Sequence, residues 1–312
     1  MKYFVSGGAG FVGSHLVDKL LAGGNQVTVY DNFSSGQKGF IEHHLKDKNF
    51  KLVEADILDF ERLKKSITGH DLVFHLASNP DIAKGIVQTD LDIKQGTLLA
   101  YNVLEAMRVT GVKKIAYASG SGVYGNVGRT KTSESFGPLL PVSMYGASKL
   151  ACEGLISAFS NLFDMQSWIF RPANITGGRS THGVVLAFIQ KLKKNPKELE
   201  ILGDGTQTKS YIHVTDLVES LLFCIQNAKE KVNVFNIASN DVLDVKSIAD
   251  IVVKKMELKD VKYKFTGGKG GWKGDVPDVV MDISRIKKLG WSAKLSSREA
   301  VERAASEILG ER

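Results

Sequence analysis

The stretch SGGAGFVGSH, residues 6–15, decides the fold, because three glycines recur in it at every third position: Gly7, Gly10 and Gly13. It follows the apolar run KYFV and opens an amphipathic segment. Glycines at these places permit a tight turn, a close approach of backbone to a pyrophosphate, and close packing of helix on strand. The helix that starts there offers N–H donors to phosphate. The residues expected to contact a dinucleotide at this turn are Gly7, Gly10, Phe11 and Val12.

A carboxylate follows at the spacing that a dinucleotide site requires. The next apolar run, QVTVYD, ends at Asp31, eighteen residues after Gly13, where it can accept hydrogen bonds from an adenosine ribose. Asn32 and Phe33 come next, so no adjacent arginine can receive a 2′-phosphate, and NAD is favoured over NADP. The alternative is a glycine-rich turn with a solvent-facing aspartate. Further cofactor contacts are expected at Asn32, Ser35, Gly36, Asp56, Ile57, Leu76, Ala77 and Ser119.

Asp56 and His75 each leave an alternative open. Asp56 and Ile57 end the third apolar run, where they can touch the edge and face of an adenine, but Asp56 also fits an exposed turn. HLAS, residues 75–78, has small residues that let the backbone lie along a cofactor. His75 fits a core position as well as a contact.

The composition is that of a soluble globular protein. The chain has 312 residues, 43% hydrophobic and 24% charged, with a formal charge of +7 from scattered lysines rather than a dense block. We therefore expect no nucleic-acid partner. Cys152 and Cys224, the only cysteines, lie in helical patterns, which argues against disulfides and thiolate metal sites, and we expect no metal. The absence of a leader pattern and of any run of about 18 apolar residues predicts a cytoplasmic protein without a membrane partner.

Short apolar runs alternate with helical segments up to Pro172, which predicts an α/β fold with a Rossmann-type doubly wound parallel sheet. The later part is glycine-rich and predicts a smaller C-terminal α/β substrate lobe. The run VNVFNIAS is expected to return to the main sheet. The predicted domains are 1–172 with 213–240, and 173–212 with 241–312. Later helices are expected near 183–194, 213–227, 245–257 and 296–309.

The catalytic candidates lie in SMYGASK, residues 143–149, where Tyr145 and Lys149 are four apart and share a helix face. An ammonium near a phenol stabilises the phenolate and lowers its pKa, and a positive nicotinamide ring lowers it further. This predicts that Tyr145 acts as a base near neutral pH. Such a pair is common by chance, and it gains meaning only from the dinucleotide motif before it.

At this point the chain resembles the extended short-chain dehydrogenase/reductases, and among them the UDP-glucose 4-epimerases. The resemblance covers nearly the whole chain, in family order: GGAGFVGSHL, YDNFSSG, VYG, YGASK, RPANITG, LGDGTQTKSYIHVTD and GWKGDVP. It implies NAD as a cofactor that stays bound, and inversion at C4 of a UDP-hexose such as UDP-glucose or UDP-galactose. Tyr145 would take the proton of the sugar 4-hydroxyl as hydride passes from C4 to NAD, and the ketose would turn over before hydride returns.

The resemblance also implies a nucleotide-sugar site in the second lobe. Asn174 looks like the residue that holds the diphosphate, Lys209 replaces a basic phosphate contact, and Asp275 lies in a shortened motif in which Trp272 stands in place of an arginine. Val279 corresponds to a gate at the sugar 2-position, where a small residue admits N-acetyl groups. Other cations able to neutralise a diphosphate, or else merely solvated, are Arg171, Arg179 and Lys273.

Two departures from the family lie near the reaction centre. Gly120 stands where relatives place a serine or threonine, so Ser121 or a water is expected to take over that hydroxyl's role. Gly96 replaces a frequent asparagine. The chain has no carboxylate at 121–122, which disfavours the dehydratases. Open alternatives are an epimerase of UDP-N-acetylhexosamine or UDP-uronate, and a sensor that binds NAD without catalysis. The segments 91–109 and 145–163 are expected to form a homodimer interface.

Overall fold

The computed structural model describes residues 1–310, which form two compact units. Unit 1 comprises 1–120, 144–171 and 221–235, and unit 2 comprises 121–143, 172–220 and 236–310. The sequence-based division placed 121–143 with the first domain. In the structure this segment belongs to unit 2, because the Thr132 N–H donates to the Val280 carbonyl at 3.0 Å and the Asn236 amide donates to the Thr132 carbonyl at 2.9 Å. That the units are separate domains stays a prediction.

The main sheet has seven strands in the order β11-β6-β5-β4-β1-β2-β3. They are β1 (Lys2–Ser6), β2 (Gln26–Asp31), β3 (Phe50–Glu54), β4 (Leu72–His75), β5 (Lys114–Ala118), β6 (Gln166–Pro172) and β11 (Val232–Ile237). Strand β1 runs parallel to both β2 and β4, with Val5 opposite Val29 and Phe74. The order 3-2-1-4-5-6 confirms the Rossmann-type sheet, and its topological switch point lies between β1 and β4.

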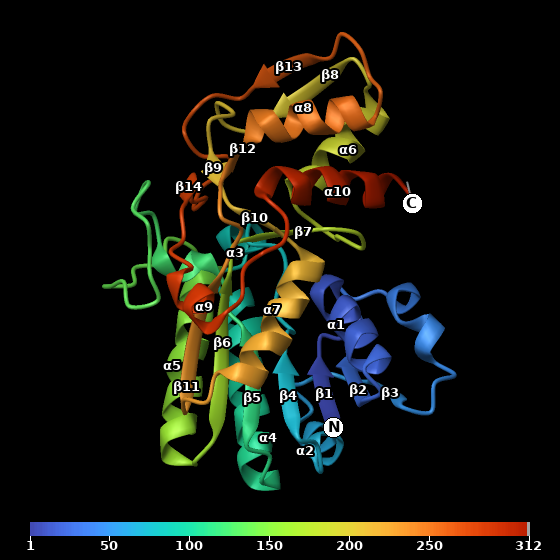
Figure 1. Cartoon of the computed structure of the whole chain (residues 1–312), viewed down its shortest axis with the longest axis vertical. Helices are drawn as coiled ribbons and strands as arrows, with labels where there is room; N and C mark the ends of the chain where they lie inside the picture. The colour runs from blue at the N-terminus through green and yellow to red at the C-terminus, as the bar shows by residue number, and fades with distance from the viewer. Residues whose placement is uncertain (311–312) are drawn as a thin grey trace. The chain divides into compact units, whose positions relative to one another are not determined.

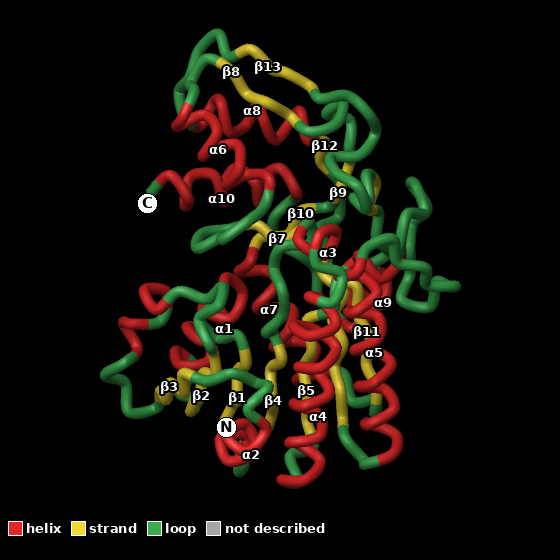
Figure 2. The backbone as a smooth tube through the Cα atoms, turned by 180° about the vertical axis from the view of Figure 1, so that it is seen from behind, coloured by secondary structure: helices red, strands yellow, loops and turns green. Residues whose placement is uncertain are grey.

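Helices cover both faces of this sheet, which explains why its strands are apolar nearly throughout. Figures 1 and 2 show α2, α4 and α5 on one face and α1 with the end of α7 on the other. The helices are α1 (Phe11–Ala22), α2 (Phe60–Ile67), α3 (Lys84–Val87), α4 (Leu98–Thr110), α5 (Met144–Leu162) and α7 (Val214–Asn227), with short turns η1 (Lys38–Phe40) and η2 (Glu42–His44). Side chains of α2, α4 and α5 form one buried cluster with those of the strands.

The helical segment expected from residue 91 begins there, but a π-helical turn, η3 (Ile93–Thr97), interrupts it before α4. Gln95 in this turn has non-helical dihedral angles. The turn packs against α5, and a Cβ at Gly96 would overlap the Ser148 hydroxyl. That hydroxyl donates to the Asp92 carbonyl at 2.7 Å. Glycine at 96 therefore lets the two helices approach closely, and π turns of this kind are frequent at functional sites.

Unit 2 has its own core, in which α6, α8 and α10 pack on one another and on β8 and β13 (Figure 1). Its elements are η4 (Ser121–Tyr124), β7 (Asn174–Thr176), α6 (Val184–Lys194), β8 (Glu198–Ile201), β9 (Thr208–Lys209), β10 (Tyr211–His213), β12 (Leu243–Asp244), α8 (Val245–Lys255), β13 (Lys262–Phe265), β14 (Asp278–Val279), α9 (Ser284–Leu289) and α10 (Ser297–Leu309). Ser296 and Glu299 form a capping box at α10.

Both cysteines are buried free thiols, Cys152 on α5 and Cys224 on α7. Burial raises the pKa of the Cys224 thiol to about 12, so it is inert at neutral pH. Within residues 1–310, no helix has the length and apolar character that crossing a membrane requires.

Candidate active site

The glycine turn after β1 brings backbone close to backbone. Gly7 has a φ of +73°, and a Cβ there would lie 2.7 Å from the Ala77 nitrogen. A Cβ at Gly13 would overlap the Gly7 carbonyl. Gly10 is the N-cap of α1, and no described side chain caps this end of the helix. The first N–H groups of α1 therefore remain directed at the turn. The turn is thus a cradle that any side chain would fill, and the N–H donors at its base are of the kind that can bind phosphate.

Asp31 is held beside this cradle. Its Oδ2 accepts the Ala9 N–H and its Oδ1 accepts the Phe33 N–H, both at 2.9 Å. The side chain is buried, and burial raises the pKa of the carboxyl, although the two N–H donors oppose that shift. Each carboxylate oxygen keeps a further lone pair that can accept a ribose hydroxyl. The solvent-facing alternative for Asp31 is therefore wrong.

The other predicted cofactor residues surround the same edge of the sheet. Asp56 accepts from the Asn32 amide at 2.9 Å, and the Ile57 carbonyl accepts from Asn102 at 3.1 Å. A Cβ at Gly36 would lie 3.0 Å from Asp31 Oδ1, so the loop that carries Ser35 and Gly36 closes over Asp31. Leu76 N–H donates to the Ser6 carbonyl at 3.1 Å, which sets the adjoining Ala77 against Gly7. Contact of these residues with a cofactor stays a prediction.

His75 is a core histidine. It is fully buried, its Nδ1 lies 2.7 Å from the Ser6 hydroxyl, and its ring stacks on Tyr117 with centroids 5.6 Å apart. Burial lowers the pKa of this imidazole to about 3, so it is neutral at physiological pH. Of the two alternatives for His75, the structure supports the core position.

Ser119 and Arg171 belong to a buried polar cluster. The Ser119 hydroxyl donates to Glu153 Oε1 at 2.6 Å, and Arg171 donates to both Glu153 oxygens at 3.0 and 2.6 Å. The Arg171 and Glu153 side chains are only 5% and 7% exposed. The expectation that Arg171 is available to neutralise a diphosphate is therefore wrong, because its charge already faces a carboxylate in the core. A cofactor contact by Ser119 stays a prediction.

Tyr145 and Lys149 project from the first turns of α5. Lys149 is buried, its Nζ donates to the Ala118 carbonyl at 2.7 Å, and it lies 5.4 Å from the centre of the Tyr145 ring. The Lys149 ammonium also lies 5.0 Å from the Tyr117 ring. The structure thus brings the predicted pair together and fixes the ammonium by the end of β5.

The environment of Tyr145 contradicts the expectation that its pKa is lowered. Burial, followed by the charge of Asp92, raises the pKa of Tyr145 to about 12 rather than lowering it. Burial lowers the pKa of Lys149 to about 8, so the protein disfavours both charged forms. Lys149 alone therefore does not make Tyr145 a base near neutral pH; a further positive charge is needed.

Asp92 is a site residue that the sequence analysis missed. It is 2% exposed, and its Oδ1 accepts from the Asn79 amide at 3.0 Å. Among residues 1–310, its Oδ2 has no hydrogen-bond partner. Burial raises the pKa of Asp92, while Lys149 opposes that shift. An unpaired buried carboxylate oxygen near a reactive pair is a signal that only the three-dimensional structure supplies.

Gly120 stands directly before η4 and faces the phenol. A Cβ there would lie 3.7 Å from the Tyr145 hydroxyl, and Gly120 is not among the glycines with positive φ. Ser121 begins η4 in unit 2, where it and Val279 line a small hollow of about 10 Å³. That volume holds about one water. The structure thus brings together two of the predicted substrate residues.

The predicted phosphate-binding residues also converge within unit 2. Lys209 Nζ lies 2.7 Å from Asp275 Oδ1, and both side chains are largely buried, at 13% and 4% exposed. The ammonium also lies 5.5 Å from the Trp272 ring. Val279 on β14 is in register with Lys209 on β9. Trp272 thus packs on Lys209, and Asp275 fixes the ammonium of Lys209.

Asn174 lies on β7, which pairs with β10, and it is in register with Tyr211 of that strand. Its backbone N–H donates to the Ser210 carbonyl at 3.2 Å, which ties β7 to the end of β9. Lys273 is exposed and Arg179 is half-buried. Diphosphate contacts by these residues stay predictions.

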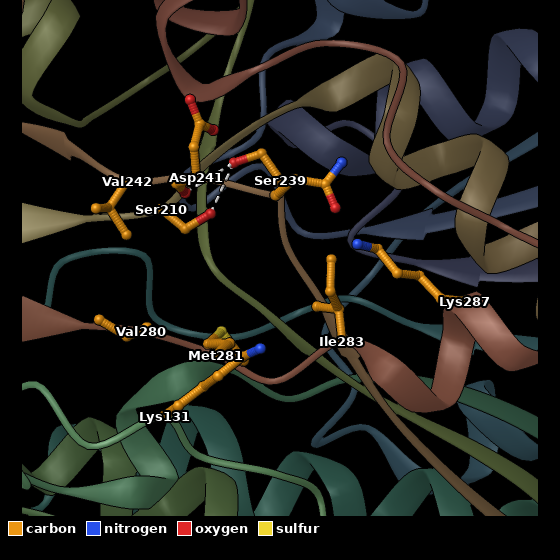
Figure 3. Close-up of a pocket in the computed structure, with 10 residues that line it drawn as sticks. Lys131, Ser210, Ser239, Asp241, Val242, Val280, Met281, Ile283 and Lys287 are labelled. Carbon is orange, nitrogen blue, oxygen red and sulfur yellow. Dashed lines mark hydrogen bonds between the residues drawn. The ribbon is translucent and has the colours of Figure 1, made fainter.

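A separate cavity of about 330 Å³ opens in unit 2, lined by Ser210, Ser239 and Val280 among others. Figure 3 shows Lys131 and Lys287 directed toward it from two sides, with Ser210 and Ser239 bonded at 2.8 Å. Successive strand residues point to opposite faces. Ser210 and Val280 therefore face away from the side that carries their neighbours Lys209 and Val279. None of the predicted site residues lines this cavity.

Comparison with known proteins decides the family. Residues 3–238 match the model of the NAD dependent epimerase/dehydratase family. The chain belongs to this family. It is 33% identical over 233 residues, 71% of this chain and 72% of the relative, to the UDP-glucose 4-epimerase of Mycolicibacterium smegmatis. It is 30% identical to UDP-glucuronic acid decarboxylase 4 of Arabidopsis thaliana, covering 96% of this chain and 67% of that protein. A crystal structure of a UDP-galactose 4-epimerase, 34% identical, superposes with a TM-score of 0.88 over 99% of both chains.

NAD is the cofactor of this family member, which is an epimerase-type enzyme. The residues present fit NAD on structural grounds of their own. The cradle at Gly7 and Gly13 has no room for a side chain, the N-terminus of α1 keeps free donors, and Asp31 keeps free lone pairs. The Rossmann order places the ligand at the same switch point, between β1 and β4.

Proposed function

We propose that this enzyme inverts C4 of a UDP-hexose, interconverting UDP-glucose and UDP-galactose. The observation that carries the proposal is the Tyr145–Lys149 pair, because a phenol beside a fixed ammonium is suited to moving one proton to and from a sugar hydroxyl. Residues 121 and 122 are Ser and Gly, so no carboxylate follows Gly120 to assist the loss of water. This favours epimerisation over dehydration.

Each residue has a defined part in the proposed reaction. Bound NAD would supply the hydride chemistry, namely removal of a hydride from the sugar carbon and its return to the opposite face. The Tyr145 oxygen accepts the proton of the 4-hydroxyl and later gives it back. Lys149, anchored on the Ala118 carbonyl, stabilises the phenolate. Ser121, or a water, completes the hydrogen bonding at the sugar oxygen in place of the hydroxyl that Gly120 lacks.

The substrate's diphosphate is proposed to bind at Lys209 and Asn174. Lys209 is held in one position by Asp275 and Trp272, so its remaining N–H donors are pre-oriented for an anion. Pairing with Asp275 brings the net charge of the pair to zero, so Asn174 and the exposed Lys273 are needed as further partners for the diphosphate. The relatives' names point to UDP-sugars as the ligand class.

A second candidate substrate is UDP-N-acetylglucosamine. Val279 is the observation in its favour, since it is in register with Lys209 and lines the same hollow as Ser121. A valine leaves space at the sugar 2-position that a larger side chain would fill. A UDP-uronate is the other alternative substrate. The alternative to an enzyme is a sensor that binds NAD without turnover.

The deciding experiment incubates the purified protein, without added cofactor, with UDP-galactose and measures UDP-glucose by proton NMR. We expect conversion in both directions, and one equivalent of NAD released on acid denaturation. Tyr145→Phe is the matched control and should retain NAD while losing turnover. A wild-type preparation that holds NAD but converts neither sugar would leave the sensor as the better explanation.

We also propose a homodimer formed by α4 and α5. Large apolar side chains are exposed on both helices, including Leu98 and Tyr101 on α4, at 44% and 45%, and Leu162 on α5, at 74%. Sedimentation velocity at micromolar concentration should give a dimer for the wild type. Tyr101→Glu should shift it to monomer, and a wild-type monomer would contradict the proposal.

A further inference from the structure

A cluster of metal-ligand side chains lies away from the candidate active site, on the outer side of unit 1. Asp18 projects from α1, and His43 and His44 project from η2. The His43 and His44 Nε2 atoms lie 3.0 and 2.7 Å from the same oxygen, Asp18 Oδ1. The three potential ligand atoms all lie within 4.8 Å of one another.

The chain after Asp31 is folded so that it delivers both imidazoles to this carboxylate. The Gln37 N–H donates to the Ala9 carbonyl at 2.9 Å, which fixes the segment at the start of α1. Ile41 is 1% exposed, so the segment is packed down before η2 begins. The His44 ring then packs against Phe50, with centroids 5.8 Å apart. The cluster is therefore a product of tertiary packing, not of a freely moving loop.

The geometry is close to that of a metal site. Zinc–nitrogen and zinc–oxygen bonds of about 2.0–2.2 Å place tetrahedral ligands about 3.3–3.6 Å apart. Both rings share Asp18 Oδ1, and their centroids are 3.9 Å apart. An opening of roughly half an ångström at each contact would admit the ion between the three atoms. A carboxylate and two imidazoles would carry one negative charge, which attracts a dication.

We propose that Asp18, His43 and His44 bind an imidazole-preferring divalent cation, of which Zn²⁺ is the leading member. Two nitrogen donors favour Zn²⁺, Co²⁺ or Ni²⁺ over Mg²⁺ and Ca²⁺, which prefer oxygen ligands. His43 is 47% exposed on its side chain, so water can fill the fourth position. The ion would tie η2 to α1. The tied segment includes Ser35 and Gly36, the predicted cofactor contacts, so the ion should slow cofactor loss.

The test uses untagged, NAD-loaded protein treated with a chelator and then titrated with Co²⁺, followed by its visible d–d absorption. Zn²⁺ affinity is measured by competition with a chromophoric chelator. We expect one equivalent of either ion to bind. Asp18→Asn and His44→Gln should each weaken binding by at least about 10-fold, because loss of even an outer partner costs a metal site about 10–100-fold. Mg²⁺ should not compete.

The matched control is His182→Gln, which removes an exposed imidazole from unit 2 and should leave the affinity unchanged. Circular dichroism and NAD content verify that each variant is folded. Equal Zn²⁺ affinity in the wild type and in Asp18→Asn would overturn the proposal, as would the absence of Zn²⁺ binding to the wild type in the competition titration.

A measurement on the wild type alone covers the case in which a variant fails to fold. Zn²⁺ should protect His43 and His44 from diethylpyrocarbonate, read by peptide mass spectrometry, while His182 stays reactive. Modification of His43 and His44 at the same rate with and without Zn²⁺ would overturn the site. The rate of NAD release with and without Zn²⁺ tests the clamping role, and equal rates would overturn that role.

Discussion

Gly120→Ser is expected to increase turnover, because it restores a hydroxyl beside the proposed base. The backbone permits the change: Gly120 is not among the glycines of positive φ, and the nearest atoms to an added Cβ are the Tyr145 hydroxyl at 3.7 Å and a ring carbon at 3.9 Å. These are ordinary van der Waals contacts. A serine oxygen, about one bond length beyond Cβ, can therefore lie at hydrogen-bond distance, about 2.7–2.8 Å, from the phenol.

The size of the gain follows from the bond that is made. A neutral hydrogen bond contributes about 0.5–1.5 kcal/mol, and 1.4 kcal/mol is about a tenfold change, so kcat should rise about 2- to 10-fold. The assay is the initial rate of UDP-galactose conversion at saturating substrate, coupled to UDP-glucose oxidation. NAD content is measured in parallel so that cofactor loss is not taken for a catalytic effect.

Gly120→Ala is the matched control, because it adds the Cβ without the hydroxyl. Alanine should leave kcat at the wild-type value or below it. Equal rates for the serine and alanine variants would refute the reasoning, since the gain would then owe nothing to hydrogen bonding. A loss of turnover in Gly120→Ser with full NAD content would show that Ser121 or a water already occupies the position.

Three further substitutions test the site. Asp92→Asn removes an anion that raises the pKa of Tyr145, so the rise of kcat with pH should move to lower pH, whereas Asp90→Asn, an exposed control, should leave the profile unchanged. Val279→Tyr should lower the ratio of UDP-N-acetylglucosamine to UDP-glucose activity at least several-fold; an unchanged ratio would contradict the gate. Glu153→Gln leaves a buried guanidinium uncompensated and should cost about 3–5 kcal/mol, read as a fall in Tm, while a loss below about 1 kcal/mol would mean that solvent reaches the pair.

Much of the fold could be predicted from local sequence, because it depends on short-range rules. The glycines of residues 6–15 and the alternation of strand and helix predict the parallel sheet, and the return of VNVFNIAS to that sheet is confirmed by β11. The helix expected near 296–309 is observed at Ser297–Leu309, where Ser296 and Glu299 form a capping box three residues apart. Signals carried by neighbouring residues suffice for such elements.

Features that depend on distant residues could not be predicted in this way. Arg171 is predicted to be one of the cations that neutralise a diphosphate or else a solvated surface cation, yet it lies on β6 and its charge is met by Glu153 of α5. The π-helical turn before α4 places Gly96 against Ser148, and these residues are 52 positions apart in the chain. No sequence pattern within one of these segments indicates its contact with the other, so the contact can be seen only in the folded chain.

The Tyr145–Lys149 pair shows what this difference means for chemistry. Four-residue spacing correctly places an ammonium near a phenol, but charge proximity is only one of three influences on a pKa, and burial opposes it here. Because burial disfavours both the phenolate and the ammonium, the resting pair holds its protons on the phenol, and the ammonium is easily neutralised. A base of this kind ionises only when additional positive charge is placed beside it. In the proposed reaction, proton removal by Tyr145 would therefore require the positive charge of an oxidised nicotinamide, and this is the cofactor form that must be bound when the sugar hydroxyl loses its proton.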